Sequence, residues 1–114
     1  MIESKDTVQQ YKWGQDCDGW HFVNDKDLSV IQEKMPPHTF EVQHYHERSK
    51  QFFYILRGTA LMKLENREVE LHQGEGIKIH PGMVHQMCNT SEDDVEFLVI
   101  SKPHSHQDRH LVKK

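Results

Sequence analysis

The chain has 114 residues, of which 35% are hydrophobic and 28% are charged; this fits one soluble globular domain and is too short for two. The formal net charge of −4 leaves no basic surface for phosphates, so we expect no nucleic-acid partner. No apolar run approaches the roughly 20 residues that span a bilayer, and the charged N-terminus lacks a signal-peptide core, so we expect a cytoplasmic protein without a membrane partner.

The first 19 residues are polar, with scattered aromatic residues and two glycines, and they predict either a loose arm or a short strand that packs elsewhere. The aromatic side chains of Trp13, Trp20 and Phe22 need cover from solvent in so small a domain. A second copy of the chain is a natural source of that cover, so we expect a homodimer.

Two strands are predicted between residues 28 and 46. Residues 28–35 are apolar enough for the first, and Pro36 and Pro37 end it because proline has no N–H for the sheet. In the next strand, residues 40–46, the even-numbered side chains share one face. We expect that face to be the apolar interior, and it carries Phe40, Val42, His44 and His46.

Further segments of branched and aromatic residues predict strands at 51–56, 60–64, 68–71, 77–79, 83–87 and 95–100. Turn-forming residues separate them at intervals of roughly 8–12 residues, and no segment has a helical period. About eight short strands without a helix predict an all-β sandwich or barrel.

His44 and His46 are two residues apart, so both side chains project from the same face of a strand. Two imidazoles on one face hold a metal ion if other segments supply further donors, and Gln51 and His85 are the best placed. The sequence therefore predicts a mononuclear metal site of three histidines and one glutamine.

Cys17 and Cys88 are expected to stay unpaired, because the reducing cytosol disfavours disulfides. Cys88 follows His85 by three residues, which places it on the opposite face of a strand. We therefore expect Cys88 to be a small buried or half-buried apolar residue and not a thiolate ligand.

At these residues the sequence resembles the cupins, small β-barrels with two consecutive motifs. The first motif is matched by His44, His46 and Gly58, while Gln51 stands at its glutamate position and His38 at its first glycine. The second motif is matched by Gly74, Gly82, His85 and Asn89, and His80 replaces its proline, with Pro81 next to it.

The resemblance implies a single cupin jelly-roll β-barrel, or double-stranded β-helix, with its core at residues 28–101. Residues 1–27 would form an N-terminal arm and the first strands, and residues 102–114 a C-terminal tail. The end of the sequence resembles the closing segment of the mannose-6-phosphate-isomerase-like cupin group. Cupins commonly dimerise, which also favours a homodimer.

The glutamine at position 51 has an electrostatic consequence. A divalent ion held by neutral ligands keeps its full charge, is a stronger Lewis acid and attracts anionic substrates. Gln51 either coordinates directly or hydrogen-bonds a bound water. Zinc, iron, nickel, manganese and copper all stay open as the metal.

Other residues for a mechanism are few. We expect Phe40, Val42, Phe53 and Ile55 to form an apolar pocket wall, with Tyr45 and Tyr54 pointing away from it. Each of His21, His38 and His80 is either a general base or a surface residue. We expect His104, His106 and His110 to lie in a solvated tail, with Asp108 and Arg109 as a surface ion pair or lid contact.

These observations favour a metal-dependent enzyme that acts on a small organic molecule, as a dioxygenase or as an isomerase or cyclase of the enolising kind. The alternative is a non-catalytic barrel that binds a small molecule or a sugar. A general acid or base would favour the enzyme, and the sequence makes none evident.

Overall fold

The computed structural model describes residues 2–112, which form strands and no helix. The all-β prediction is therefore confirmed. No helix in this range is long and apolar enough to cross a membrane. The strands are β1 (Gln9–Trp13), β2 (Cys17–Asn24), β3 (Ser29–Met35), β4 (Thr39–Phe40), β5 (His44–Tyr45), β6 (Lys50–Arg57), β7 (Ala60–Leu64), β8 (Glu68–Leu71), β9 (Gly76–Ile79), β10 (His85–Asn89), β11 (Val95–Lys102) and β12 (His110–Leu111).

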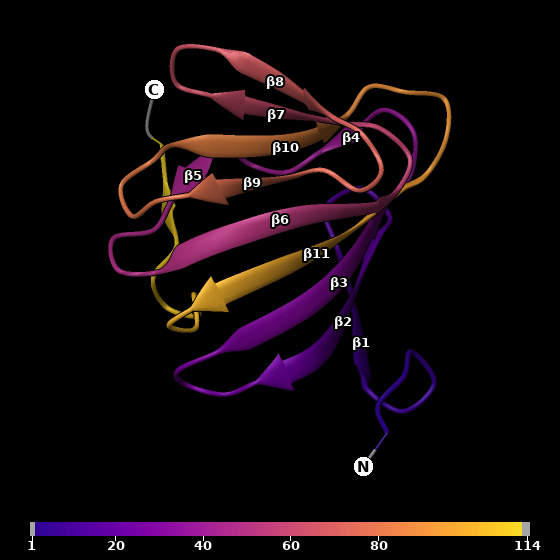
Figure 1. The fold of residues 1–114 in the computed structure, drawn as a ribbon, viewed down its shortest axis with the longest axis vertical. Helices are drawn as coiled ribbons and strands as arrows, with labels where there is room; N and C mark the ends of the chain where they lie inside the picture. The colour runs from indigo at the N-terminus through magenta and orange to yellow at the C-terminus, as the bar shows by residue number, and fades with distance from the viewer. Residues whose placement is uncertain (1, 113–114) are drawn as a thin grey trace.

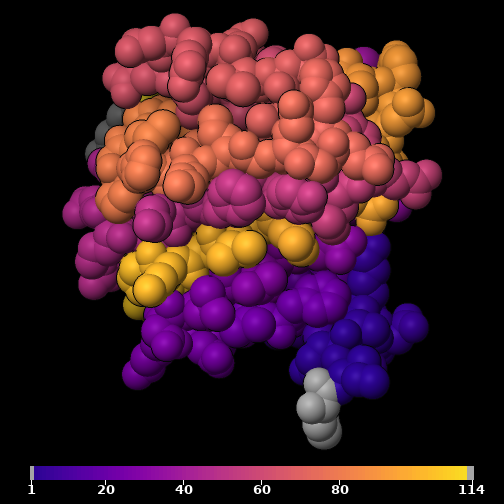
Figure 2. All heavy atoms as spheres, in the orientation of Figure 1, coloured from indigo at the N-terminus to yellow at the C-terminus, as the bar shows by residue number. Residues whose placement is uncertain are grey.

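The strands form two antiparallel sheets (Figure 1). One sheet has the order β1-β2-β3-β11-β6-β9, and the other has the order β12-β5-β10-β7-β8, with β4 also paired to β10. The late strand β11 lies between β3 and β6, and Figure 2 shows it as a band between those two segments. This arrangement is the double-stranded β-helix that the two motifs predict.

The core lies between the two sheets, and strict alternation along β6 and β11 builds it. Phe53 and Ile55 on β6 face Phe97 and Val99 on β11 across the sheet, and all four side chains are buried. Gln51 is in phase with Phe53 and Ile55, so it also points inward. A polar side chain thus enters the apolar interior at the end of β6 that lies nearest the histidines.

Gly58 ends β6 at a position that only glycine fits. Its φ of +86° lies in the left-handed region, and a Cβ there would come within 2.5 Å of the carbonyl oxygen of Asp94. This close approach gives a physical reason for the glycine that ends the first cupin motif.

The N-terminal residues form a hairpin of β1 and β2 that extends the sheet beyond β3. Trp13 packs against the core, and Trp20 is only 8% exposed, with the Lys5 ammonium 4.4 Å from the centre of its ring. Of the two interpretations of residues 1–19, the loose arm is wrong. Because the chain itself buries Trp20 and half-buries Trp13, these two side chains no longer argue for a partner subunit, and the homodimer stays a prediction.

The strand predicted at 40–46 is interrupted, and part of its expected inner face is wrong. Phe40 pairs with Cys88 and His44 with His85. The two pairs are therefore four residues apart on this segment but only three residues apart on β10. The extra residue is a bulge that inverts the alternation. Phe40 and Val42 are therefore each 54% exposed, whereas His44 is buried.

Candidate metal centre

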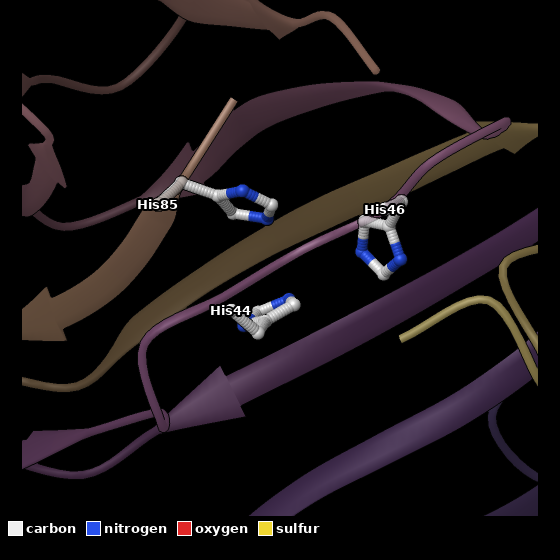
Figure 3. Close-up of side chains that lie close together, drawn as sticks. All are labelled: His44, His46 and His85. Atoms are coloured by element: carbon white, nitrogen blue, oxygen red, sulfur yellow. The ribbon is translucent and has the colours of Figure 1, made fainter. Parts of the chain in front are cut away.

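Three histidines converge at one end of the barrel (Figure 3). His44 lies on β5, His46 follows that strand, and His85 begins β10 directly opposite His44. Their ligand nitrogens all lie within 4.8 Å of one another, and the three side chains are at most 4% exposed. Three imidazoles at this spacing are able to hold one metal ion.

Each imidazole is oriented by a backbone carbonyl. The Nδ1 atoms of His44, His46 and His85 lie 2.7, 2.8 and 2.9 Å from the carbonyl oxygens of Val42, Asp108 and Met83, respectively. Because a carbonyl only accepts, Nδ1 carries the hydrogen and Nε2 keeps its lone pair. The Nε2 atoms of His46 and His85 are buried without a protein partner, as metal ligation requires.

The three rings are uncharged at neutral pH. Burial disfavours the imidazolium and lowers the pKa of His44 to about 3 and of His85 to about 4. Burial also lowers the pKa of His46. Neutral imidazoles have a lone pair available without first losing a proton, so metal binding need not compete with protonation.

Gln51 adds another buried lone pair from the inner face of β6. Its amide nitrogen donates a hydrogen bond of 2.9 Å to the Ser101 hydroxyl. The remaining atom, Oε1, is buried with no hydrogen-bond partner. An unpaired buried carbonyl is costly, so this oxygen fits a site whose ligand supplies positive charge.

The C-terminal segment supports the site, so the expected solvated tail is wrong at residues 108–111. Strand β12 pairs with β5, and the Asp108 side chain is only 3% exposed. Its carboxylate accepts hydrogen bonds from the backbone N–H groups of Glu47, Arg48 and Ser49 at 3.0, 3.0 and 2.9 Å. Asp108 therefore forms neither the expected surface ion pair with Arg109 nor a lid contact: it anchors the loop that follows His46, and His110 Nε2 lies 3.5 Å from its Oδ1.

A cavity of about 240 Å³ opens beside the histidines. His44, His46 and Gln51 line it, while His85 lies behind them against the rings of His44 and Phe53. Of the expected apolar wall, Phe53 lines the cavity and Ile55 lies in the core; Trp13, Ile31 and Val99 complete it. Tyr45 and Tyr54 do not line the cavity, as predicted.

The family model described as Cupin domain matches residues 31–101, more than half of the chain. The protein belongs to the cupins.

The cupin has relatives of several kinds. It is 30% identical to the oxalate-binding protein of Thermotoga maritima, over 68% of this chain and 64% of that protein. The structure of KdgF from Halomonas sp. superposes with a TM-score of 0.82 at 18% identity, over 91% of this chain and 95% of that one. The polyketide cyclase RemF from Streptomyces resistomycificus gives a TM-score of 0.79 at 18% identity, over 100% and 87% of the two chains. At such identities the two structures share the fold alone.

Two carboxylates that line the cavity of this cupin, Glu33 and Glu41, were not predicted from the sequence. Burial raises the pKa of Glu33 to about 7, although the Tyr11 hydroxyl donates a 2.9 Å hydrogen bond to it. Burial, and then the charge of Glu33, raise the pKa of Glu41 to about 8. Glu33 lies two residues from both Ile31 and Met35, so alternation along β3 would have placed it on the inner face. Glu41, in contrast, faces inward only because of the bulge.

Three further histidines lie outside the cavity. His38, at a φ of 59°, pairs with Glu92 at 2.7 Å on the surface, and His80 is exposed in a turn. His21 packs against the Tyr11 ring at 4.7 Å between centroids and is not among the residues that line the cavity. These positions give none of the three a role as general base in the cavity.

Proposed function

We propose that this cupin is a metal-dependent enzyme that moves a proton on a small carbonyl compound, as an isomerase or cyclase. The observation that carries the proposal is the combination of an oriented, uncharged histidine cluster and two carboxylates around one small cavity. Groups that exchange protons near neutral pH are what enolisation requires. No described residue of the cavity wall favours oxygenation in the same specific way.

His44, His46 and His85 would hold the metal ion through Nε2, and Gln51 Oε1 would be a fourth ligand. The unpartnered atoms at His46, His85 and Gln51 fit this role. A bound divalent ion would act as a Lewis acid that polarises a carbonyl oxygen. Because all four donors are neutral, the ion would keep its full charge.

The cavity limits the substrate. At about 30 Å³ for each water, 240 Å³ holds roughly eight waters or an organic molecule of similar bulk. Its walls combine apolar side chains with Arg109, whose guanidinium has no carboxylate within salt-bridge distance among residues 2–112. An unpaired arginine at the cavity favours a substrate that carries a carboxylate.

Metal analysis and hydrogen exchange test this function together. Protein purified without added metal is analysed by elemental mass spectrometry, and 2-oxobutyrate or acetylacetone is then incubated with it in D₂O. We expect loss of the C–H signal next to the carbonyl in proton NMR spectra, at least about 10-fold faster than with chelator-treated protein or free metal. Oxygen uptake without exchange would instead identify a dioxygenase.

A second candidate is binding of a small dicarboxylate without turnover. It is favoured by the relative named oxalate-binding protein and by the cationic Arg109 at the cavity. Titration calorimetry with oxalate tests it: one site per chain with no change in the oxalate after incubation would support binding, and no heat of binding would exclude it.

A further inference from the structure

The N-terminal hairpin delivers Tyr11 to the cavity through a specific arrangement of three strands. Tyr11 on β1 pairs with Gly19 on β2, and Gly19 pairs with Glu33 on β3. A Cβ on Gly19 would overlap the Tyr11 ring, so the ring lies across the glycine. Only with glycine in the middle strand does the tyrosine hydroxyl reach Glu33, to which it donates a hydrogen bond of 2.9 Å.

Glu41 approaches the same cavity from the opposite sheet. Its Oε1 accepts a hydrogen bond of 2.8 Å from the backbone N–H of Met87, which fixes the carboxyl group. Glu33 Oε1 and Glu41 Oε2 accept no hydrogen bond from residues 2–112, and neither carboxyl has a cation within salt-bridge distance in that range. Each group therefore keeps one oxygen free for a proton.

Two carboxyl groups in one small cavity are unfavourable for folding, since burial and mutual repulsion both oppose their charged forms. A purely structural role would be served better by apolar side chains of similar volume. Their environments also differ. Glu33 accepts a hydrogen bond from a hydroxyl and Glu41 accepts one from a backbone N–H, and the positive charge of Arg109 in the cavity wall acts to lower the pKa of both. Paired carboxyls with different donors are typical of acid and base assigned to separate groups.

We propose that Glu33 and Glu41 are the proton-transfer pair of this cavity and that Tyr11 is the positioning residue for Glu33. The assignment rests on the proposed function. Glu33 accepts a proton from the carbon beside a carbonyl; the electrons of that C–H bond form a C=C bond, and the carbonyl oxygen takes the negative charge. Glu41 then gives its proton to carbon, the C=C electrons form the new C–H bond, and the carbonyl is restored.

This sequence transfers one proton from carbon to Glu33 and one from Glu41 to carbon, and it uses no oxidant or reductant. Glu33 ends protonated and Glu41 ionised, and proton exchange with solvent resets the pair. The substrate is a carbonyl compound with an acidic C–H bond, and the proximity of Arg109 adds a preference for one that bears a carboxylate.

Glu33→Gln tests the pair while keeping the volume of the side chain. The matched control is Glu65→Gln at an exposed position, and each protein is assayed for metal content and for exchange of 2-oxobutyrate hydrogens in D₂O. We expect Glu33→Gln to keep its metal and lose at least about 100-fold in exchange rate, with Glu65→Gln unchanged. Wild-type exchange in a metal-loaded Glu33→Gln protein would overturn this inference alone. No exchange by metal-loaded wild type would overturn the proposed function and, with it, the catalytic role of Glu33.

Tyr11→Phe and Gly19→Ala test the positioning role by a readout that needs no turnover. Carboxyl carbon-13 NMR of metal-free protein follows the titration of Glu33, assigned by its absence in Glu33→Gln. We expect the Glu33 midpoint to rise in both variants, because the hydroxyl stabilises the carboxylate and both changes remove it. An unchanged midpoint in both variants would overturn the role of Tyr11.

Discussion

Asp108→Asn is the change that most directly tests how the C-terminal segment holds the site. Asp108 Oδ1 accepts one backbone N–H, from Glu47, and Oδ2 accepts two, from Arg48 and Ser49. An asparagine has a single acceptor oxygen. If that oxygen keeps the bonds to Arg48 and Ser49, its NH₂ group faces the Glu47 N–H, and two donors meet.

The expected cost is worked out from these bonds. Hydrogen bonds to a charged group are worth about 1.5–3 kcal/mol and neutral ones about 0.5–1.5, so two weakened bonds cost about 2 kcal/mol. The unpaired N–H of Glu47 adds about 1 kcal/mol. Burial alone would raise the pKa of Asp108, but the three N–H groups lower it from 3.8 to about 2. At about 1.4 kcal/mol for each unit, this gives about 2 kcal/mol independently. We therefore expect a loss of about 2–3 kcal/mol at pH 7.

Urea unfolding followed by tryptophan fluorescence measures the loss, with Asp27→Asn at an exposed position as the control for one negative charge. Because the folded-state pKa of Asp108 is lowered, its contribution is present above about pH 4 and is lost as the pH falls toward 2. The difference between wild type and variant should therefore shrink by about half at pH 3. A variant within about 0.5 kcal/mol of wild type at pH 7 would refute the reasoning.

Three further predictions concern the ligands and Glu33. His46→Ala should abolish stoichiometric metal binding in a calorimetric titration, and full occupancy would contradict the ligand set. Gln51→Ala should weaken binding by about 10–100-fold and Gln51→Glu should strengthen it, whereas two unchanged affinities would remove residue 51 from the site. The raised pKa of Glu33 means that its stabilising contribution is present below pH 4.5 and lost as the pH rises through about 7. Glu33→Gln should therefore be about 1–2 kcal/mol more stable than wild type at pH 8 and similar at pH 4.5, and urea unfolding at both values checks this.

The fold could be predicted from the sequence where inward and outward side chains alternate regularly within a single segment. Strand β6 alternates from Gln51 to Ile55 and β11 alternates from Val95 to Ser101, so Gln51 and Phe53 were placed on the interior face from sequence alone. Prediction failed between Phe40 and His44, because a bulge depends on how many residues β10 sets against that segment. Nothing in the sequence of residues 40–46 shows how many residues of β10 lie opposite them, so simple alternation placed Glu41 on the wrong face.

The candidate site was readable only as far as its motif residues. The three histidines lie in motifs with fixed spacing, and each position could be named. Asp108 and Tyr11 contribute through contacts with Ser49, 59 residues away, and with Glu33, 22 residues away. Such pairs form only when the two ends of the chain close onto the barrel, and nothing in their local sequence distinguishes them from surface residues.

Two residues that line the cavity lie outside the range that the family model matches. Residues 31–101 contain the three histidines and Gln51, and these alone would suit oxygenation, isomerisation or simple binding. Tyr11 precedes that range and Arg109 follows it, and both line the cavity beside the carboxylates. Tyr11 donates a hydrogen bond that favours the ionised form of Glu33, and Arg109 is a cation that attracts a carboxylate. Both features fit the proposed proton transfer on a substrate that carries a carboxylate. The two terminal segments therefore contribute to the proposed reaction alongside the histidines and carboxylates of the barrel.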